Sequence, residues 1–249
     1  MAARLKLIVA YDGAPFSGWQ SQPNRNGIQD HLEKAFAQIC SHPVRVHGAG
    51  RTDAGVHALG QCAHVDLPVR RYGPDRWRSA LNGILPTAIR IMDCTFVAES
   101  FHARFSAKKK IYRYRVWNGE VLPPLENGRA WHVRDPIDQE IVTTAAKSFI
   151  GEHDFASFSA NRGVRVADTV RKLHAVRVRK AGPLFTFEFE GDGFLYKMVR
   201  MMMGALIQVG VGKASLHDIQ SRLAQPRRAI IAERNVAPAA GLFLFRVRY

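Results

Sequence analysis

The alternation of apolar and polar residues along the chain predicts a mixture of strands and helices. Positions 5–9 alternate and lead into a Tyr-Asp-Gly turn, which predicts an opening strand. Apolar residues then recur at helical spacing over positions 28–39, as in an amphipathic helix. A strand over residues 44–46 and another over residues 61–67 flank a glycine-rich loop. We expect these two strands to hold the loop rigidly.

The second half of the chain carries the strongest strand signal. Residues 173–178 and 185–189 alternate on either side of Lys-Ala-Gly-Pro at positions 180–183, which predicts a β-hairpin. A last strand is predicted over residues 242–249.

Helix caps mark two further elements. Asp135 followed by Pro136 is typical of an N-cap with proline at the first helical position, and it predicts a helix over residues 137–150 that stops at Gly151. The Ser-Leu-His-Asp sequence at 215–218 is typical of a capping box, which predicts a short helix ending before Pro226.

These elements favour an α+β fold with mainly antiparallel sheet. Adjacent strands are joined by hairpins and helices are interspersed, whereas repeated βαβ units would need a regular alternation. The composition places a domain boundary only loosely, near residues 101–110. We therefore divide the chain into an N-terminal part, residues 1–105, and a C-terminal part, residues 106–249.

The charge of the chain points to a polyanionic partner. It has 36 Lys and Arg against 21 Asp and Glu, a net charge of +15. Residues 1–100 contribute 11 basic and 8 acidic residues, so residues 101–249 supply most of the excess. We expect the C-terminal part to form a basic surface that binds a polyanion with an affinity that depends steeply on salt.

The cysteines and histidines mainly exclude function classes. Cys40, Cys62 and Cys94 are isolated, which suits three reduced thiols in the cytoplasm. Residues 201–211 form the longest largely apolar stretch, which is too short to span a bilayer. The chain has neither HExxH nor the paired motifs of zinc deaminases, so we expect no metal.

The most informative stretch is the glycine-rich loop at residues 47–58, which holds the lone carboxylate of Asp53 two residues after Arg51. A dinucleotide fingerprint would need glycine at position 53, and no Gly-Lys-Ser/Thr follows for a P-loop. A simple turn, with Gly55 at positive φ, is the structural alternative. A carboxylate beside a cation favours a nucleophile or a base.

The residues Gly-Arg-Thr-Asp-Ala-Gly-Val-His-Ala at 50–58 resemble the catalytic loop of the tRNA pseudouridine synthase A family. The resemblance makes Asp53 the essential aspartate, with Arg51 placed to hold the opened RNA strand. Shorter matches extend in order along nearly the whole chain. The resemblance further implies two related α/β subdomains with the active site in the cleft between them. It also implies a homodimer that acts on tRNA without a cofactor, on uridines around positions 38, 39 and 40 of the anticodon stem-loop.

A second group of candidate site residues follows the Phe-His-Ala-Arg-Phe motif at residues 101–105. In a strand, Tyr112 and Tyr114 would share one face and Arg113 and Arg115 the other, so one face could stack on bases and the other could meet phosphate. This segment resembles the second motif of the same family, whose first tyrosine lies against the target base. The resemblance therefore makes Tyr112 a substrate-binding residue, and we expect Tyr114 to pack in the core.

A third group of candidate site residues follows a glycine-rich turn at residues 191–193. Lys197 and Arg200 are three apart, so we expect them on one face of a Met-rich helix, where burial would be costly without an anion. We expect Asp53 to be that anion. The segment resembles the third motif of the family, whose arginine, here Arg200, pairs with the catalytic aspartate.

The predicted chemistry converts uridine to pseudouridine after the base is flipped out of the RNA stem. Asp53 could serve as nucleophile at C1′ of the ribose or as base for the C2′ proton, and the sequence leaves both open. Two other functions compete with this one. A non-catalytic RNA-binding protein would explain the charge, and a metal-dependent nuclease would need Asp12, Asp53 and Asp66 to cluster.

Overall fold

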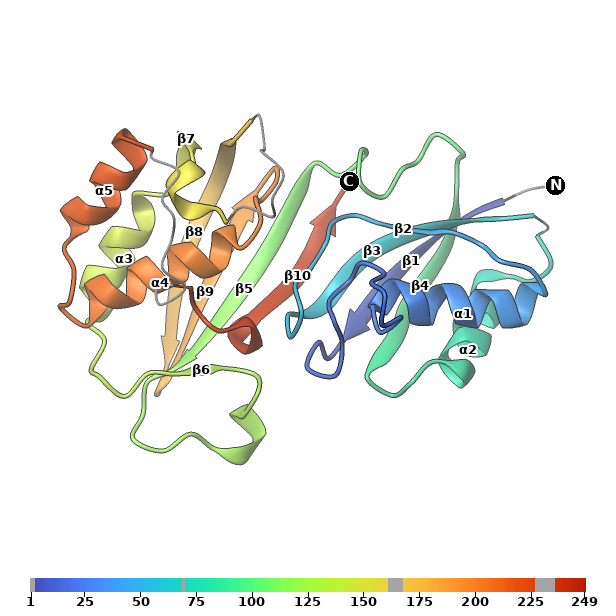
Figure 1. Cartoon of the computed structure of the whole chain (residues 1–249), viewed down its shortest axis with the longest axis horizontal. Helices are drawn as coiled ribbons and strands as arrows, with labels where there is room; N and C mark the ends of the chain where they lie inside the picture. Colours follow the sequence, from blue (N-terminus) through green and yellow to red (C-terminus); the bar gives the residue numbers. More distant parts are fainter. Residues whose placement is uncertain (1–2, 69, 161–167, 227–235) are drawn as a thin grey trace. The chain divides into compact units, whose positions relative to one another are not determined.

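The computed structural model describes residues 3–68, 70–160, 168–226 and 236–249. The chain forms two compact units (Figure 1). Unit 1 comprises Met1–Lys108 together with Phe243–Tyr249, and unit 2 comprises Lys109–Leu242. Residues Phe243–Tyr249 cluster with unit 1, whereas the division drawn from the sequence keeps them with residues 106–249.

Unit 1 is a sheet with two helices. Its strands, in spatial order, are β4 (Ile89–Val97), β1 (Ala3–Tyr11), β3 (His57–Leu67) and β10 (Leu242–Arg248), with β2 (Val46–Gly48) also paired to β3. The helices are α1 (Ile28–Cys40) and α2 (Pro74–Ile84). They meet through the rings of Phe36 and Trp77, whose centroids are 5.5 Å apart. β10 is parallel to β3, with Phe243 opposite His57.

Unit 2 has five strands and three α-helices in its described part. Its strands, in order, are β5 (Lys109–Trp117), β9 (Leu184–Gly191), β8 (Val170–Ala181) and β7 (Gly151–Asp154), with β6 (Trp131–His132) beside β5. The helices are α3 (Gln139–Lys147), α4 (Met198–Gly210) and α5 (Leu216–Ala224). Short 3-10 turns lie at Pro124–Glu126, Ala156–Phe158 and Ala239–Gly241.

The core of unit 2 explains why α4 is apolar nearly all round. Phe185, Phe187 and Phe189 on β9 are fully buried, as are most residues of α4. A helix buried on several sides needs no polar face. Gly210 at its end faces the side chain of Val142 on α3 so closely that a Cβ there would lie 2.2 Å from a methyl carbon.

The expected α+β class with mainly antiparallel pairing is confirmed. The predicted hairpin is β8 and β9, which turn at Gly182 with φ +56°. The capping box at Ser215 is present at the start of α5. Within the described residues, no helix is long and apolar enough to cross a membrane.

The predicted start of α3 is wrong. The helix begins at Gln139, and Asp138 is its N-cap, whose side chain accepts the N–H groups of Glu140 and Ile141. Asp135 instead forms an ion pair with Lys213. The helix also ends at Lys147, before the expected stop at Gly151.

Candidate active site

The loop between β2 and β3 carries Asp53 and is held by the segment that follows β1. The carbonyl of Thr52 accepts the N–H of Trp19 at 3.0 Å. The hydroxyls of Thr52 and Tyr11 are hydrogen-bonded at 2.8 Å, and both residues are buried. Burial raises the pKa of Tyr11, so its hydroxyl keeps its proton. The residue before Asp53 is thus fixed through its backbone and its side chain.

Two glycines allow the same segment to approach the loop. A Cβ on Gly18 would lie 2.7 Å from the carbonyl oxygen of Thr52 and 3.0 Å from the nitrogen of Ala54. Gly18 also has φ +95°, which side-chain-bearing residues rarely adopt. A Cβ on Gly13 would lie 2.1 Å from the carbonyl oxygen of Val56. The loop therefore packs backbone against backbone.

Asp53 opens a tight turn. The N–H of Val56 donates to the carbonyl of Asp53 at 3.1 Å, and Gly55 has φ +76°, as the third position of a type II turn requires. The turn expected as the structural alternative is therefore present, and it carries the candidate carboxylate. Asp53 is partly buried, and Arg51 is exposed.

The flanks of the loop are tied to β3. Gln61 is fully buried and donates through Nε2 to the carbonyl of Gly50 at 2.8 Å. The N–H of Ala49 donates to the carbonyl of Cys62 at 2.8 Å. The expectation that two strands hold this loop is confirmed, although the first of them begins only at Val46.

Sequence reasoning missed the supporting residues Tyr11, Gly18 and Trp19 as parts of this site. They lie among the shorter matches to the family, to which the sequence assigns no role. The available signal was a polar aromatic at the buried end of a strand, followed by a closely spaced pair of glycines. Their contacts reach across more than thirty positions of sequence, which local patterns do not encode.

The carboxylates named for a metal-dependent nuclease have other partners. Asp12 accepts the N–H of Ala14 at 3.0 Å through Oδ1. Asp66 accepts two hydrogen bonds from Arg4, at 2.7 and 2.8 Å. In the described segments, no three His, Cys, Asp or Glu side chains are grouped as a metal ion would require.

In unit 2, Tyr112 and Tyr114 lie on the buried face of β5 but differ in their surroundings. Tyr114 is fully buried, and its hydroxyl donates to the carbonyl of Pro238 at 2.7 Å. Burial raises its pKa strongly. The ring of Tyr112 meets Phe194 edge to face, with centroids 4.9 Å apart. Tyr114 thus packs as expected.

The arginines on the other face of β5 are paired with carboxylates. Nε of Arg113 lies 2.8 Å from Oε2 of Glu188, which stands opposite it on β9. Nη2 of Arg115 lies 2.8 Å from Oε2 of Glu126. Arg177 on β8 is a second partner of Glu188, at 3.0 Å. The charge on this face is therefore compensated within unit 2.

The expected helical face shared by Lys197 and Arg200 is wrong. α4 begins at Met198, and Lys197 is its N-cap, with a left-handed backbone at φ +58°. That conformation takes Lys197 out of the helical spacing. Its ammonium lies 5.4 Å from the ring centroid of Tyr196.

Arg200 is held within the first turn of α4. Its Nε donates to the carbonyl of Ala237 at 2.7 Å, and its own carbonyl accepts the N–H of Ala237 at 3.0 Å. The positive end of the helix dipole and the cations of Lys197 and Arg200 coincide here. Such an arrangement favours an anion nearby.

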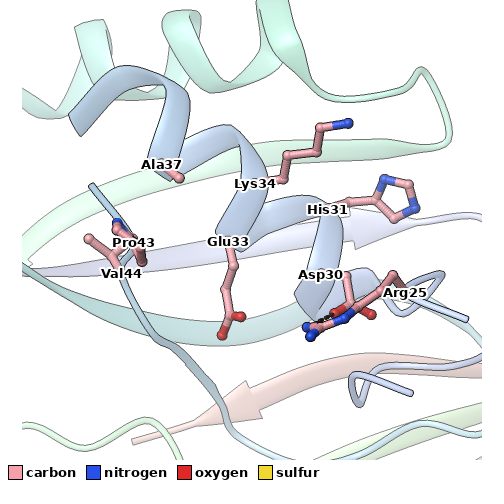
Figure 2. A pocket seen from close by; sticks show the side chains of 8 residues that line it. All are labelled: Arg25, Asp30, His31, Glu33, Lys34, Ala37, Pro43 and Val44. Carbon is pink, nitrogen blue, oxygen red and sulfur yellow. Dashed lines mark ion pairs between the residues drawn. The ribbon is translucent and has the colours of Figure 1, made fainter. Parts of the chain in front are cut away.

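A groove of about 410 Å³ lies beside α1 (Figure 2). Its lining residues are Arg25, Asp30, His31, Glu33, Lys34, Ala37, Pro43 and Val44. Its carboxylates serve the fold, since Asp30 accepts the N–H of Gly27 at the start of α1 and Glu33 accepts the N–H of Val46 at 3.0 Å. None of the residues predicted for catalysis lines it, and we assign it no part in the reaction.

The chain resembles known proteins over nearly its whole length. A family model described as tRNA pseudouridine synthase matches residues 7–106 and 145–249, which include Asp53 and Arg200 but leave Tyr112 outside. A protein of Limosilactobacillus fermentum named tRNA pseudouridine synthase A is 43% identical over 99% of this chain and 96% of that protein. One of the same name from Solidesulfovibrio magneticus is 46% identical over 99% of this chain and 91% of that protein. Among solved structures, a chain of a Cbf5-Nop10-Gar1 complex is 12% identical with a TM-score of 0.37, covering 82% of this chain and 45% of that chain.

Proposed function

Because this chain belongs to the tRNA pseudouridine synthase family, it isomerises uridine to pseudouridine in tRNA, and we propose that Asp53 is the carboxylate that drives the reaction. The observation that supports this assignment is the loop itself. Asp53 follows a threonine fixed at both its hydroxyl and its carbonyl, and it opens a turn closed by Gly55. A carboxylate held in this way is preorganised to react at one position of the ribose, as nucleophile or as base.

The reaction breaks the bond between N1 of uracil and C1′ of ribose and joins C5 of the turned base to C1′. C5 loses a proton and N1 gains one, so the isomerisation needs no oxidant, no energy input and no cofactor. Asp53 acts as nucleophile at C1′ or as base for the C2′ proton, and either role needs an ionised carboxylate. Deuterium at C2′ separates the two roles, because a primary isotope effect is expected only for the base.

The other site residues are assigned from the resemblance together with their surroundings. Arg51 is exposed on the loop and would hold the RNA strand from which the uridine is flipped. Tyr112 would stack on the flipped uracil and take the C5 proton. Arg200, whose guanidinium is anchored to Ala237, would supply the counter-charge of Asp53. Lys197 would add to the positive potential at the start of α4.

The substrate and assembly also follow the resemblance. We infer that the target uridines lie around positions 38, 39 and 40 of the anticodon stem-loop and that the enzyme is a cytoplasmic homodimer. The net charge of +15 supports a polyanionic substrate, and the three free thiols suit a reducing compartment. Light scattering on the purified protein tests the dimer, and mapping of pseudouridine in reacted tRNA tests the positions.

The decisive experiment uses tRNA with tritium at C5 of uridine, because tritium is released only when the new bond forms at C5. We expect Asp53→Asn to abolish release while its affinity for tRNA stays within a few-fold of wild type, since the cationic surface is unchanged. The matched control is Asp75→Asn, which alters a highly exposed carboxylate on α2 and should retain full activity. Release by Asp53→Asn near the wild-type rate would overturn the assignment. A passive RNA-binding protein would release no tritium at all.

A further inference from the structure

Phe105 presents an aromatic ring to solvent. Its side chain lies in unit 1 and is 75% exposed. Burying a phenylalanine ring stabilises a fold, and Phe105 forgoes most of that gain. A single exposed apolar residue is common on protein surfaces, so the case for a contact with a partner depends on the residues that surround the ring.

The backbone around Phe105 forms a closed turn held by four hydrogen bonds. The N–H of Ser106 donates to the carbonyl of His102 at 2.9 Å, and the N–H of His102 donates to Oγ of Ser106 at 2.9 Å. The imidazole of His102 accepts the N–H groups of Arg104 and Phe105 on Nδ1, at 3.1 and 3.3 Å. A neutral imidazole is required for this, and burial and neighbouring positive charges lower the pKa of His102.

Ring contacts connect this turn to the strands beside the Asp53 loop. The ring of Phe105 lies 4.4 Å from that of His102, which lies 4.7 Å from His64 on β3. His64 is in turn stacked on His47 of β2 at 4.9 Å. A continuous row of ring contacts therefore runs from β2 and β3, the strands that hold the catalytic loop, to the exposed ring of Phe105.

A cation accompanies the exposed ring. The guanidinium carbon of Arg104 lies 5.5 Å from the centroid of Phe105, and Arg104 is exposed. Lys108, three residues further on, is exposed as well. An aromatic face beside cations matches single-stranded RNA, where bases offer π-faces and phosphates offer charge.

We propose that the turn at residues 102–105 is a second RNA contact, in which an unpaired base of the tRNA substrate stacks on Phe105 while Arg104 meets an adjacent phosphate. The contact lies outside the catalytic residues assigned above. It rests on the proposed function for the identity of the RNA. A stacking contact of this kind discriminates little between bases, because every base has a π-face.

The test measures tRNA affinity over a series of salt concentrations for single variants of the full-length protein. Phe105→Ala should weaken binding between about 5-fold and 150-fold and leave the salt dependence unchanged, because stacking displaces no counterions. Phe105→Trp, which keeps an aromatic ring at this position, should bind tRNA as tightly as the wild type does. Arg104→Ala should reduce the slope of log affinity against log salt by about 1.

Leu125→Ala is the matched control, since Leu125 is an apolar residue of unit 2 with 82% exposure. It should bind as wild type does. Binding by Phe105→Ala within twofold of wild type would overturn the proposal, and so would a failure of Phe105→Trp to restore affinity. Failure of the proposed function is distinguishable, because it would appear as absent tritium release by the wild-type enzyme.

Discussion

A methyl group added at Gly18 should displace the loop that carries Asp53. In Gly18→Ala, the new carbon would lie 2.7 Å from the carbonyl oxygen of Thr52 and 3.0 Å from the nitrogen of Ala54. Ordinary contacts begin near about 3.5 Å, so one of the two backbones must move by roughly 0.5–1 Å. The new side chain would also sit at φ +95°.

Two costs add up in this variant. A side chain at positive φ costs about 1–2 kcal/mol, and overpacking costs typically about 1–3 kcal/mol. We therefore expect the free energy of unfolding, measured in urea, to fall by about 2–5 kcal/mol. A displacement of about 1 Å can cost about 100-fold in rate, so we expect kcat for tritium release to fall between about 10-fold and 100-fold. Affinity for tRNA should change little, since Gly18 carries no charge.

Gly182→Ala separates the backbone strain from the collision. Gly182 also has positive φ, at +56°, but a Cβ there would meet nothing within 4 Å. This control should lose only the cost of the positive φ, about 1–2 kcal/mol of stability, and keep its kcat. If Gly18→Ala also kept its kcat and lost no more stability than Gly182→Ala, the packing of Gly18 against the loop would not be what positions Asp53.

Three further outcomes are expected. Tyr112→Phe should lose far more activity than Tyr114→Phe, which should lose about 1 kcal/mol of stability with its buried hydrogen bond; comparable activity losses would contradict the assignment. Burial, together with nearby positive charges, lowers the pKa of His64 to about 4. His64 therefore takes up a proton near pH 6.5 in the unfolded chain but only near pH 4 in the folded protein. The free energy of unfolding should therefore be unaffected by His64 above about pH 6.5 and should fall by up to ~3 kcal/mol as the pH drops to about 4. Urea titrations should show a smaller fall in His64→Gln than in the wild type, and equal falls would refute this expectation. Arg200→Met should be nearly inactive and less stable, and adding Asp53→Asn should recover part of that stability, whereas strict additivity in a double-mutant cycle would reject the pairing.

Local signals predicted the elements that depend on neighbouring residues. The capping box at Ser215 works through a side chain and a backbone three positions apart, so its sequence suffices to locate the helix. Asp135-Pro136 offered a similar signal and misled, because Asp135 is engaged by Lys213 and the cap is supplied by Asp138. The competing partner lies far along the chain, where no local pattern can show it.

In the candidate site too, local sequence patterns predicted what neighbouring residues determine and missed the contacts between distant segments. The motif around Asp53 identified the loop, and the turn at Gly55 followed from its residue type. The approach of Gly18 to Thr52 joins distant segments, and only the folded chain reveals it. Lys197 was expected on a helix because its spacing from Arg200 fits one, but the left-handed backbone that precedes α4 is not encoded by that spacing.

The pairing of β10 with β3 constrains the order in which the protein can fold during its synthesis. Phe243 lies opposite His57, directly after the Asp53 loop, so unit 1 lacks a strand until Phe243–Tyr249 have left the ribosome. Unit 2 is contained within Lys109–Leu242 and has been made in full by then. We therefore expect the sheet of unit 1 to be completed last, although most of its residues are synthesised first. A nascent or truncated chain that ends before Phe243 would leave the edge of β3 beside the loop unpaired and open to aggregation.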